Sequence, residues 1–163
     1  MKKFVILFFL IFISIPVHAK NFEYKYGRCK YVYHPHNESS YQHSYCAIHN
    51  GIEEYELSDK TRVDCLTEKY AIEFDFANKK YESVGQALWY GINTGKTPKV
   101  VLILDSKYKK EQMRYFDRIK KIGEVYNFEV EYITDDILSL DKNGKCPYTD
   151  CKCNKNKKGV NDE

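Results

Sequence analysis

Three acidic residues fall inside two short segments that have the pattern of β-strands. Asp64 lies in the apolar run 63–66, and Glu73 and Asp75 alternate with apolar residues across 71–76. Carboxylates are poor strand formers and are costly to bury without a partner, whereas hard divalent cations prefer oxygen ligands. The pattern suggests a metal site shared by neighbouring strands. The alternative is a solvated acidic face on an antiparallel sheet.

The segment that follows, 82–90, has helical spacing and adds two polar side chains. Gln86 and Tyr90 lie four residues apart, so both can point from one face of a helix toward the same place. This arrangement favours the metal site over the solvated face. The residues expected to pack the helix against the core are Val84, Leu88 and Trp89.

In order and spacing, these three elements resemble the PD-(D/E)xK nuclease superfamily. That superfamily has an Asp on one strand, a D/E-x-K on the next and, in its RecB-type branch, a Q-x-x-x-Y motif on the following helix. Asp64, Glu73, Gln86 and Tyr90 match those positions, and the resemblance covers residues 38–133. It implies an α/β fold with a restriction-endonuclease-like mixed central sheet flanked by helices.

The sequence departs from the family pattern at Asp75, which stands where the family has a lysine. Some restriction enzymes of the superfamily carry an acidic residue there, and others place the lysine on the following helix. By resemblance, Lys80 or its neighbour Lys79 is the candidate for that position here.

The resemblance implies metal-assisted hydrolysis of phosphodiester bonds in DNA or RNA, with Mg²⁺ or Mn²⁺ as cofactor. The alternative is a catalytically inactive protein of the same fold that serves as an exported binding module. The implied metal ligands are Glu38, Asp64, Glu73 and Asp75. The implied catalytic residues are Asp64, Glu73, Lys80, Gln86 and Tyr90.

Glu38 enters this set from a helix that precedes the strands. Asn37 and the two following serines are good cap residues for a helix that we expect to end at Asn50, with Gly51 as the terminating glycine. In the family, a glutamate on this helix often joins the metal site. The alternative role for Glu38 is an acid stabilised by the helix dipole. Acids of the strand 52–57 that could replace it are Glu53, Glu54 and Glu56.

The first nineteen residues have the form of a secretory signal peptide. Lys2 and Lys3 precede an apolar run, and small residues stand before a cut expected after Ala19. No later stretch is long and apolar enough to span a membrane, so we expect an exported protein, periplasmic or secreted. The leader has two lysines and no acid, so the formal charge falls from +3 to +1 on cleavage. Contact with nucleic acid would therefore need a local basic patch.

Six cysteines in an exported chain indicate an oxidising compartment and up to three disulfides. The competing interpretation is a zinc site at the last three cysteines, whose spacing is irregular for structural zinc, and we favour disulfides. The candidates are Cys29, Cys46, Cys65, Cys146, Cys151 and Cys153.

The remaining chain is assigned to three parts. Residues 20–36 form an N-terminal arm in which His34 and His36 are expected at a surface turn rather than on a metal. Residues 37–140 form the PD-(D/E)xK-like domain, and residues 141–163 form a loose, disulfide-tethered tail.

Two further strands and a long helix are expected within that domain. The strand 99–104 should be buried on both faces, and a last strand follows at 128–133. The helix between them, 107–126, has a core side and a basic side that we expect to be solvated rather than bound to phosphates. The core side comprises Met113, Phe116, Ile119, Ile122 and Val125. The basic side comprises Lys109, Lys110, Arg114, Arg118 and Lys121.

Overall fold

The structure is a computed structural model that describes residues 35–155. The predicted signal peptide, most of the predicted arm with Cys29 and His34, and residues 156–163 lie outside this range. Among the described residues, no helix combines the length and the apolar composition needed to cross a membrane.

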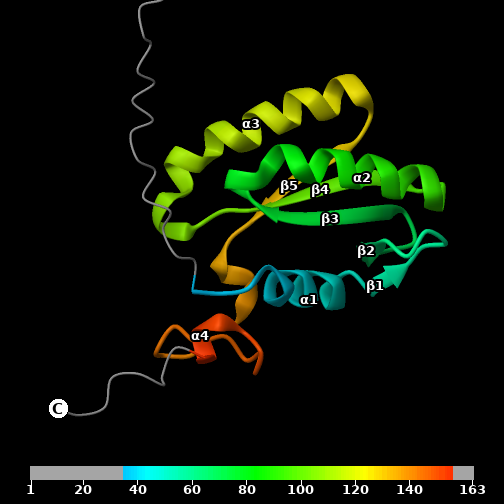
Figure 1. Cartoon of the computed structure of the whole chain (residues 1–163). Helices are drawn as coiled ribbons and strands as arrows, with labels where there is room; N and C mark the ends of the chain where they lie inside the picture. Colours follow the sequence, from blue (N-terminus) through cyan, green and yellow to red (C-terminus); the bar gives the residue numbers. More distant parts are fainter. Residues whose placement is uncertain (1–34, 156–163) are drawn as a thin grey trace, which may run out of the picture. The chain divides into compact units, whose positions relative to one another are not determined.

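Five strands form one mixed sheet in which spatial order follows sequence order (Figure 1). The first three strands pair antiparallel, and the last two are parallel to the third and to each other. The strands are β1 (Ile52–Glu56), β2 (Arg62–Leu66), β3 (Tyr70–Phe76), β4 (Thr97–Ile103) and β5 (Glu129–Ile133).

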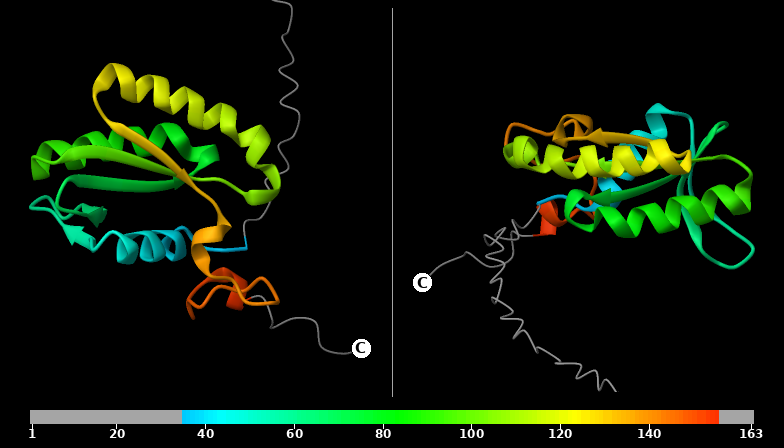
Figure 2. Two further views of the ribbon diagram at one scale, coloured as in Figure 1. Left: turned by 180° about the vertical axis from the view of Figure 1, so that it is seen from behind. Right: turned by 90° about the horizontal axis from the view of Figure 1, so that it is seen from above.

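Helices cover both faces of the sheet. Helix α1 (Glu38–Ile48) lies on one face, and α2 (Lys80–Thr94) and α3 (Lys109–Tyr126) lie on the other (Figure 2). A 3-10 turn precedes α2 at Ala77–Lys79. The predicted α/β class, with a mixed sheet flanked by helices, is confirmed. Shorter elements are the 3-10 turns Ser106–Tyr108 and Asp135–Leu138 and the short helix α4 (Lys152–Lys155).

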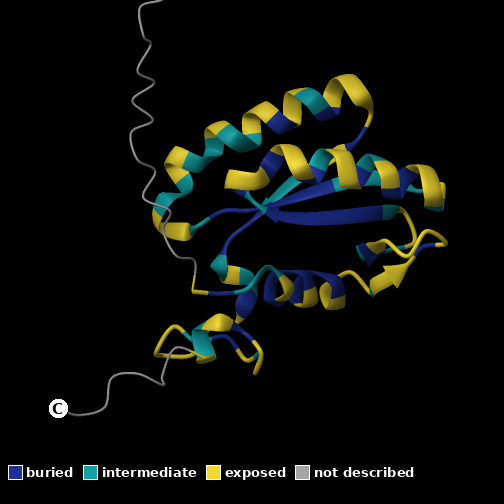
Figure 3. Cartoon of the chain, viewed as in Figure 1, coloured by how far each residue is buried: buried dark blue, intermediate teal, exposed yellow. Residues whose placement is uncertain are grey.

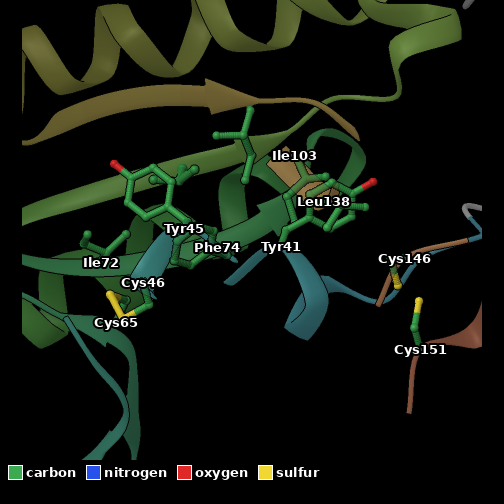
Figure 4. Packing of buried hydrophobic residues seen from close by; sticks show 12 residues of the cluster. Tyr41, Tyr45, Cys46, Cys65, Ile72, Phe74, Ile103, Leu138, Cys146 and Cys151 are labelled. Carbon is green, nitrogen blue, oxygen red and sulfur yellow. A yellow bond between two sulfur atoms is a disulfide. The ribbon is translucent and has the colours of Figure 1, made fainter. Parts of the chain in front are cut away.

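Strand β4 is the centre of the core, as its unbroken apolar sequence predicts. The second half of β4 is buried (Figure 3). Its buried residues alternate between two clusters: Val101 and Ile103 pack with α1, and Val100 and Leu102 pack with α2 and α3. On the α1 side, Phe74 of β3 lies against aromatic rings of α1 (Figure 4). Every second residue of β3 therefore faces α1, and the residues between them, Glu73 and Asp75, face the other way.

The predictions that Trp89 and Val125 pack against the core are wrong. Trp89 is 44 % exposed and its indole N–H donates to Asp59, and Val125 is 70 % exposed. Both lie off the buried stripe of their helix. In α2 that stripe contains Ala87 and Tyr90, and in α3 it contains Ile119. Most of the predicted basic side of α3 is exposed to solvent.

The segment 141–155 is not the loose tail predicted from its composition. Cys146 and Cys151 are buried, and they join the cluster between the sheet and α1. Asn37 holds this segment with two hydrogen bonds: its side chain donates to the carbonyl of Asp150 and accepts from the backbone N–H of Lys152. The segment is therefore packed beside the start of α1.

The end of α1 is fixed by a disulfide between Cys46 and Cys65, which joins the helix to β2 (Figure 4). Asn50, with φ of 52°, takes the left-handed position expected for Gly51. Gly51 has a different role. A Cβ there would overlap the sulfur of Cys65 and lie 2.6 Å from that of Cys46.

We expect Gly51→Ala to lower the free energy of unfolding by about 1–3 kcal/mol, because the methyl group overpacks the disulfide. Gly85→Ala is the matched control. Gly85 lies within α2 and a Cβ there meets nothing within 4 Å, so the substitution should stabilise by about 0.5–1 kcal/mol. Urea unfolding of the oxidised proteins measures both, and equal effects would contradict the steric role of Gly51.

Candidate functional site

Strands β2 and β3 separate at Asp64. Their backbone pairing includes Cys65–Ile72 and Leu66–Ala71 and extends no further along β2. At the next position, Oδ2 of Asp64 accepts a hydrogen bond of 2.8 Å from the backbone N–H of Phe74. The carboxylate thus takes the place of a ladder hydrogen bond and stands in the gap between the strands.

The two acids of β3 are buried beside this gap. Glu73 is 5 % exposed and Asp75 is 3 % exposed. Oδ1 of Asp75 accepts from the backbone N–H of Phe76 at 2.8 Å. The alternative of a solvated acidic face is therefore excluded for β3, whose two faces are both buried.

Glu38, the first residue of α1, completes the group. Its side chain makes a hydrogen bond with that of Asp75 and lies close enough to Asp75 and Asp64 for their charges to act on it. The structure thus brings together all four predicted metal ligands from three separate elements. We call Glu38, Asp64, Glu73 and Asp75 the carboxylate cluster.

Burial and mutual repulsion make the cluster hard to ionise. Burial and the charge of Asp64 raise the pKa of Glu73 from 4.5 to about 10. Burial and the charges of Asp75 and Asp64 raise the pKa of Glu38 from 4.5 to about 8. Burial raises the pKa of Asp64 to about 6 against the opposing hydrogen bond from Phe74, and burial also raises the pKa of Asp75. A cation among these groups would reverse that balance.

One oxygen of the cluster lacks a partner. Oε2 of Glu73 is buried and accepts no hydrogen bond within the described part of the chain. Leaving a buried acceptor unsatisfied costs about 1–3 kcal/mol. The donor set is all oxygen, which suits a hard divalent cation such as Mg²⁺ or Mn²⁺.

Lys79, rather than Lys80, is the lysine that acts on the carboxylate cluster. The charge of Lys79 lowers the pKa of both Glu38 and Asp75. The ammonium group of Lys80 instead lies 4.1 Å from the ring centroid of Tyr115 on α3, and burial lowers its pKa. Of the two lysines that the sequence offered for the family's position, Lys79 therefore lies near the acids and Lys80, the one assigned a catalytic role, lies against α3.

The two polar residues of α2 also reach the site. Gln86 is exposed, and Tyr90 is 5 % exposed. Burial and the charges of Glu73 and Asp64 raise the pKa of Tyr90, and a hydrogen bond from Gln86 opposes that shift. The helical spacing thus brings Gln86 and Tyr90 together beside Glu73, as predicted.

Two further residues lie near the cluster: Gln42, which was not predicted as a site residue, and Glu54, which the sequence offered only as a replacement for Glu38. Nε2 of Gln42 donates to the backbone carbonyl of Asp64 and to Oε1 of Glu54, both at 2.7 Å. Glu54 has φ of 50°, a left-handed conformation that is costly for a residue other than glycine and that often occurs at functional sites. The charge of Glu54 raises the pKa of Asp64. The sequence did not single out Glu54 from Glu53 and Glu56, because no local pattern predicts its left-handed backbone conformation.

Comparison with protein-family models, with curated proteins and with solved structures found no match for this chain. The function is therefore inferred from the chain's own residues and geometry.

Replacing Glu73 with glutamine should stabilise the metal-free protein at alkaline pH. Because the folded-state pKa of Glu73 is raised from 4.5 to about 10, the stability that its proton provides is complete below pH 4.5 and is lost as the pH rises toward 10. Glu73→Gln cannot ionise, so its free energy of unfolding should exceed that of the wild type by several kcal/mol near pH 8, because the wild type loses stability with each pH unit above 4.5. The difference should disappear at acid pH.

Urea unfolding in chelator, repeated across this pH range, measures the difference. Asp117→Asn on the exposed side of α3 is the control and should follow the wild type. An unchanged pH dependence in Glu73→Gln would show that Glu73 is ionised in the folded protein.

Proposed function

We propose that this protein is an exported, metal-dependent nuclease of the PD-(D/E)xK type that hydrolyses phosphodiester bonds in DNA or RNA. The observation that carries the proposal is the carboxylate cluster, with its unsatisfied buried oxygen on Glu73. Four oxygen-bearing side chains crowded out of water are unstable alone and are stabilised by a divalent cation. The order of helix, three strands, helix and strand agrees with a restriction-endonuclease-like fold.

The carboxylate cluster supplies the ligands. Asp64 and Glu73, with Glu38 or Asp75, would hold one or two Mg²⁺ or Mn²⁺ ions. A cation bound there supplies Lewis-acid activation of the phosphate and of the attacking water. Asp64 is fixed for this by the Phe74 N–H and by Gln42, which holds its backbone carbonyl.

The groups around the cluster divide the remaining tasks. Lys79 would stabilise negative charge that develops on the phosphate, the task that the family gives to the lysine replaced here by Asp75. Gln86 is exposed at the rim and would orient the water or the phosphate, and Tyr90 beneath it supports Gln86 and Glu73.

A local basic surface supports nucleic acid as substrate. The charges of Arg114 and Arg118 act on Lys80, which adjoins Lys79 in the chain. These side chains gather positive charge one residue along the chain from Lys79, although the formal charge of the whole chain is only +3. Phosphate backbones are bound by such patches.

The location outside the cytoplasm is part of the proposal. The predicted leader at residues 1–19 indicates export, to the periplasm or the medium, and the disulfide between Cys46 and Cys65 is compatible with an oxidising compartment.

The proposal predicts cleavage of plasmid and single-stranded nucleic acid by the purified protein with Mg²⁺ or Mn²⁺, and none with EDTA. Asp64→Asn and Glu73→Gln should abolish cleavage because each removes a ligand, and Asp117→Asn should retain it. Lys79→Met should lower the rate about 100-fold, whereas its neighbour Lys80→Met should have a much smaller effect.

Folded protein that cuts no DNA or RNA and binds neither metal would contradict the proposal. That result would favour the alternative of a catalytically inactive binding protein, which the acidic residue at position 75 also favours. Cleavage that survives both Asp64→Asn and Glu73→Gln would show that the activity does not come from the carboxylate cluster.

A further inference from the structure

A second group of potential ligands lies just before the start of α1, where the C-terminal segment packs against the helix. His36, Cys146, Cys151 and Cys153 each offer one ligand atom, and these four atoms lie within 4.8 Å of one another. The sulfurs of Cys146 and Cys153 are 3.4 Å apart, and Sγ of Cys151 is 3.7 Å from Nδ1 of His36. The sulfur atoms of Cys146 and Cys151 point toward each other (Figure 4).

The separations of 3.4 Å and 3.7 Å are close to those of ligands around a single tetrahedral ion, and the other pairs lie within 4.8 Å. With zinc–sulfur bonds of about 2.3 Å and zinc–nitrogen bonds of about 2.0–2.1 Å, tetrahedral ligand atoms stand roughly 3.5–3.8 Å apart. Three sulfurs and one imidazole nitrogen form a soft donor set that selects zinc over Mg²⁺. This donor set contrasts with the all-oxygen carboxylate cluster.

The ligand group is enclosed and held in place. His36 is 2 % exposed, Cys146 is 4 % exposed and Cys151 is fully buried. The backbone N–H of Asn37 donates to Sγ of Cys151 at 3.4 Å, the kind of outer contact that orients a metal-bound thiolate. The side chain of Asn154 donates to the carbonyls of Cys146 and Tyr148 and so fixes the loop between the cysteines.

Disulfides explain this arrangement less well. Cys146, Cys151 and Cys153 are not joined to one another, although Cys46 and Cys65 in the same structure are. A disulfide between two of the three would leave the third cysteine outside the bond, whereas one tetrahedral ion would take all three sulfurs together with His36. The buried position of His36 also contradicts the surface turn predicted for it.

We propose that His36, Cys146, Cys151 and Cys153 bind one structural zinc ion that fastens the C-terminal segment to the start of α1. The cysteines come from one end of the described chain and the histidine from the other, so the ion closes a loop that includes the whole sheet. His36 is two residues before Glu38, so the ion also fixes the helix turn that carries this member of the carboxylate cluster. The zinc site itself does not depend on the proposed nuclease activity.

The test begins with the protein purified from cells without added metal or reductant. Elemental analysis should find one zinc ion per chain. Cys151→Ser should lose that zinc, and Cys29→Ser, a cysteine outside the ligand group, should keep it. His49→Gln, on the exposed end of α1, is the matched histidine control for His36→Gln.

Cobalt titration keeps the test valid if Cys151→Ser fails to fold. The reduced, zinc-free wild type should bind one equivalent of Co²⁺ and develop the intense visible absorption of a tetrahedral thiolate site. Absence of that absorption, or disulfide mapping that pairs the three cysteines in the purified protein, would overturn the proposal. Loss of zinc in Cys29→Ser to the same extent as in Cys151→Ser would also overturn the ligand assignment. Neither readout uses nuclease activity, so failure here leaves the carboxylate cluster untested.

Discussion

Buried carboxylates that lie close together repel one another. The structure places four such groups side by side: Glu38, Asp64, Glu73 and Asp75. Burial and the neighbouring charges raise the pKa of Glu38 and of Glu73 well above the ordinary range, so the metal-free site favours their protonated forms near neutral pH. A fold gains no stability from this arrangement by itself. The buried Oε2 of Glu73 has no hydrogen-bond partner among the described residues, which fits a bound cation. Such a cation would offset the repulsion among the four carboxylates by coordinating their oxygens.

The fold imposes this crowding through features outside the cluster. Strands β2 and β3 part after Cys65 and Ile72, and the side chain of Asp64 occupies the opening. The disulfide fastens the end of α1 to β2, and the C-terminal segment packs against the start of α1, so the helix that carries Glu38 is held at both ends. The left-handed backbone of Glu54 adds local strain beside Asp64. Strain, burial and like charge at one place are typical of a site maintained for chemistry rather than for stability.

Much of this organisation could be predicted from sequence because periodicity reports on local structure. The alternation of β3, the apolar run of β4 and the four-residue spacing of Gln86 and Tyr90 each identify an element and its faces. The choice between Lys79 and Lys80 could not be predicted, because a 3-10 turn between strand and helix decides which lysine faces the acids. The packing of segment 141–155 could not be predicted, because its polar composition favours disorder. Cys146 and Cys151 are buried there by contacts with residues more than a hundred positions away.

Paramagnetic broadening by Mn²⁺ tests most directly whether the carboxylate cluster binds a divalent cation. As a hard ion, Mn²⁺ prefers these oxygens to the sulfurs of the His36 and cysteine group. In nuclear magnetic resonance spectra, substoichiometric Mn²⁺ should broaden the backbone amide signals of Glu38, Asp64 and Phe74 first, and Glu73→Gln should lose that selectivity. Uniform broadening of exposed acidic residues, unchanged in Glu73→Gln, would show that the four carboxylates do not form a cation site.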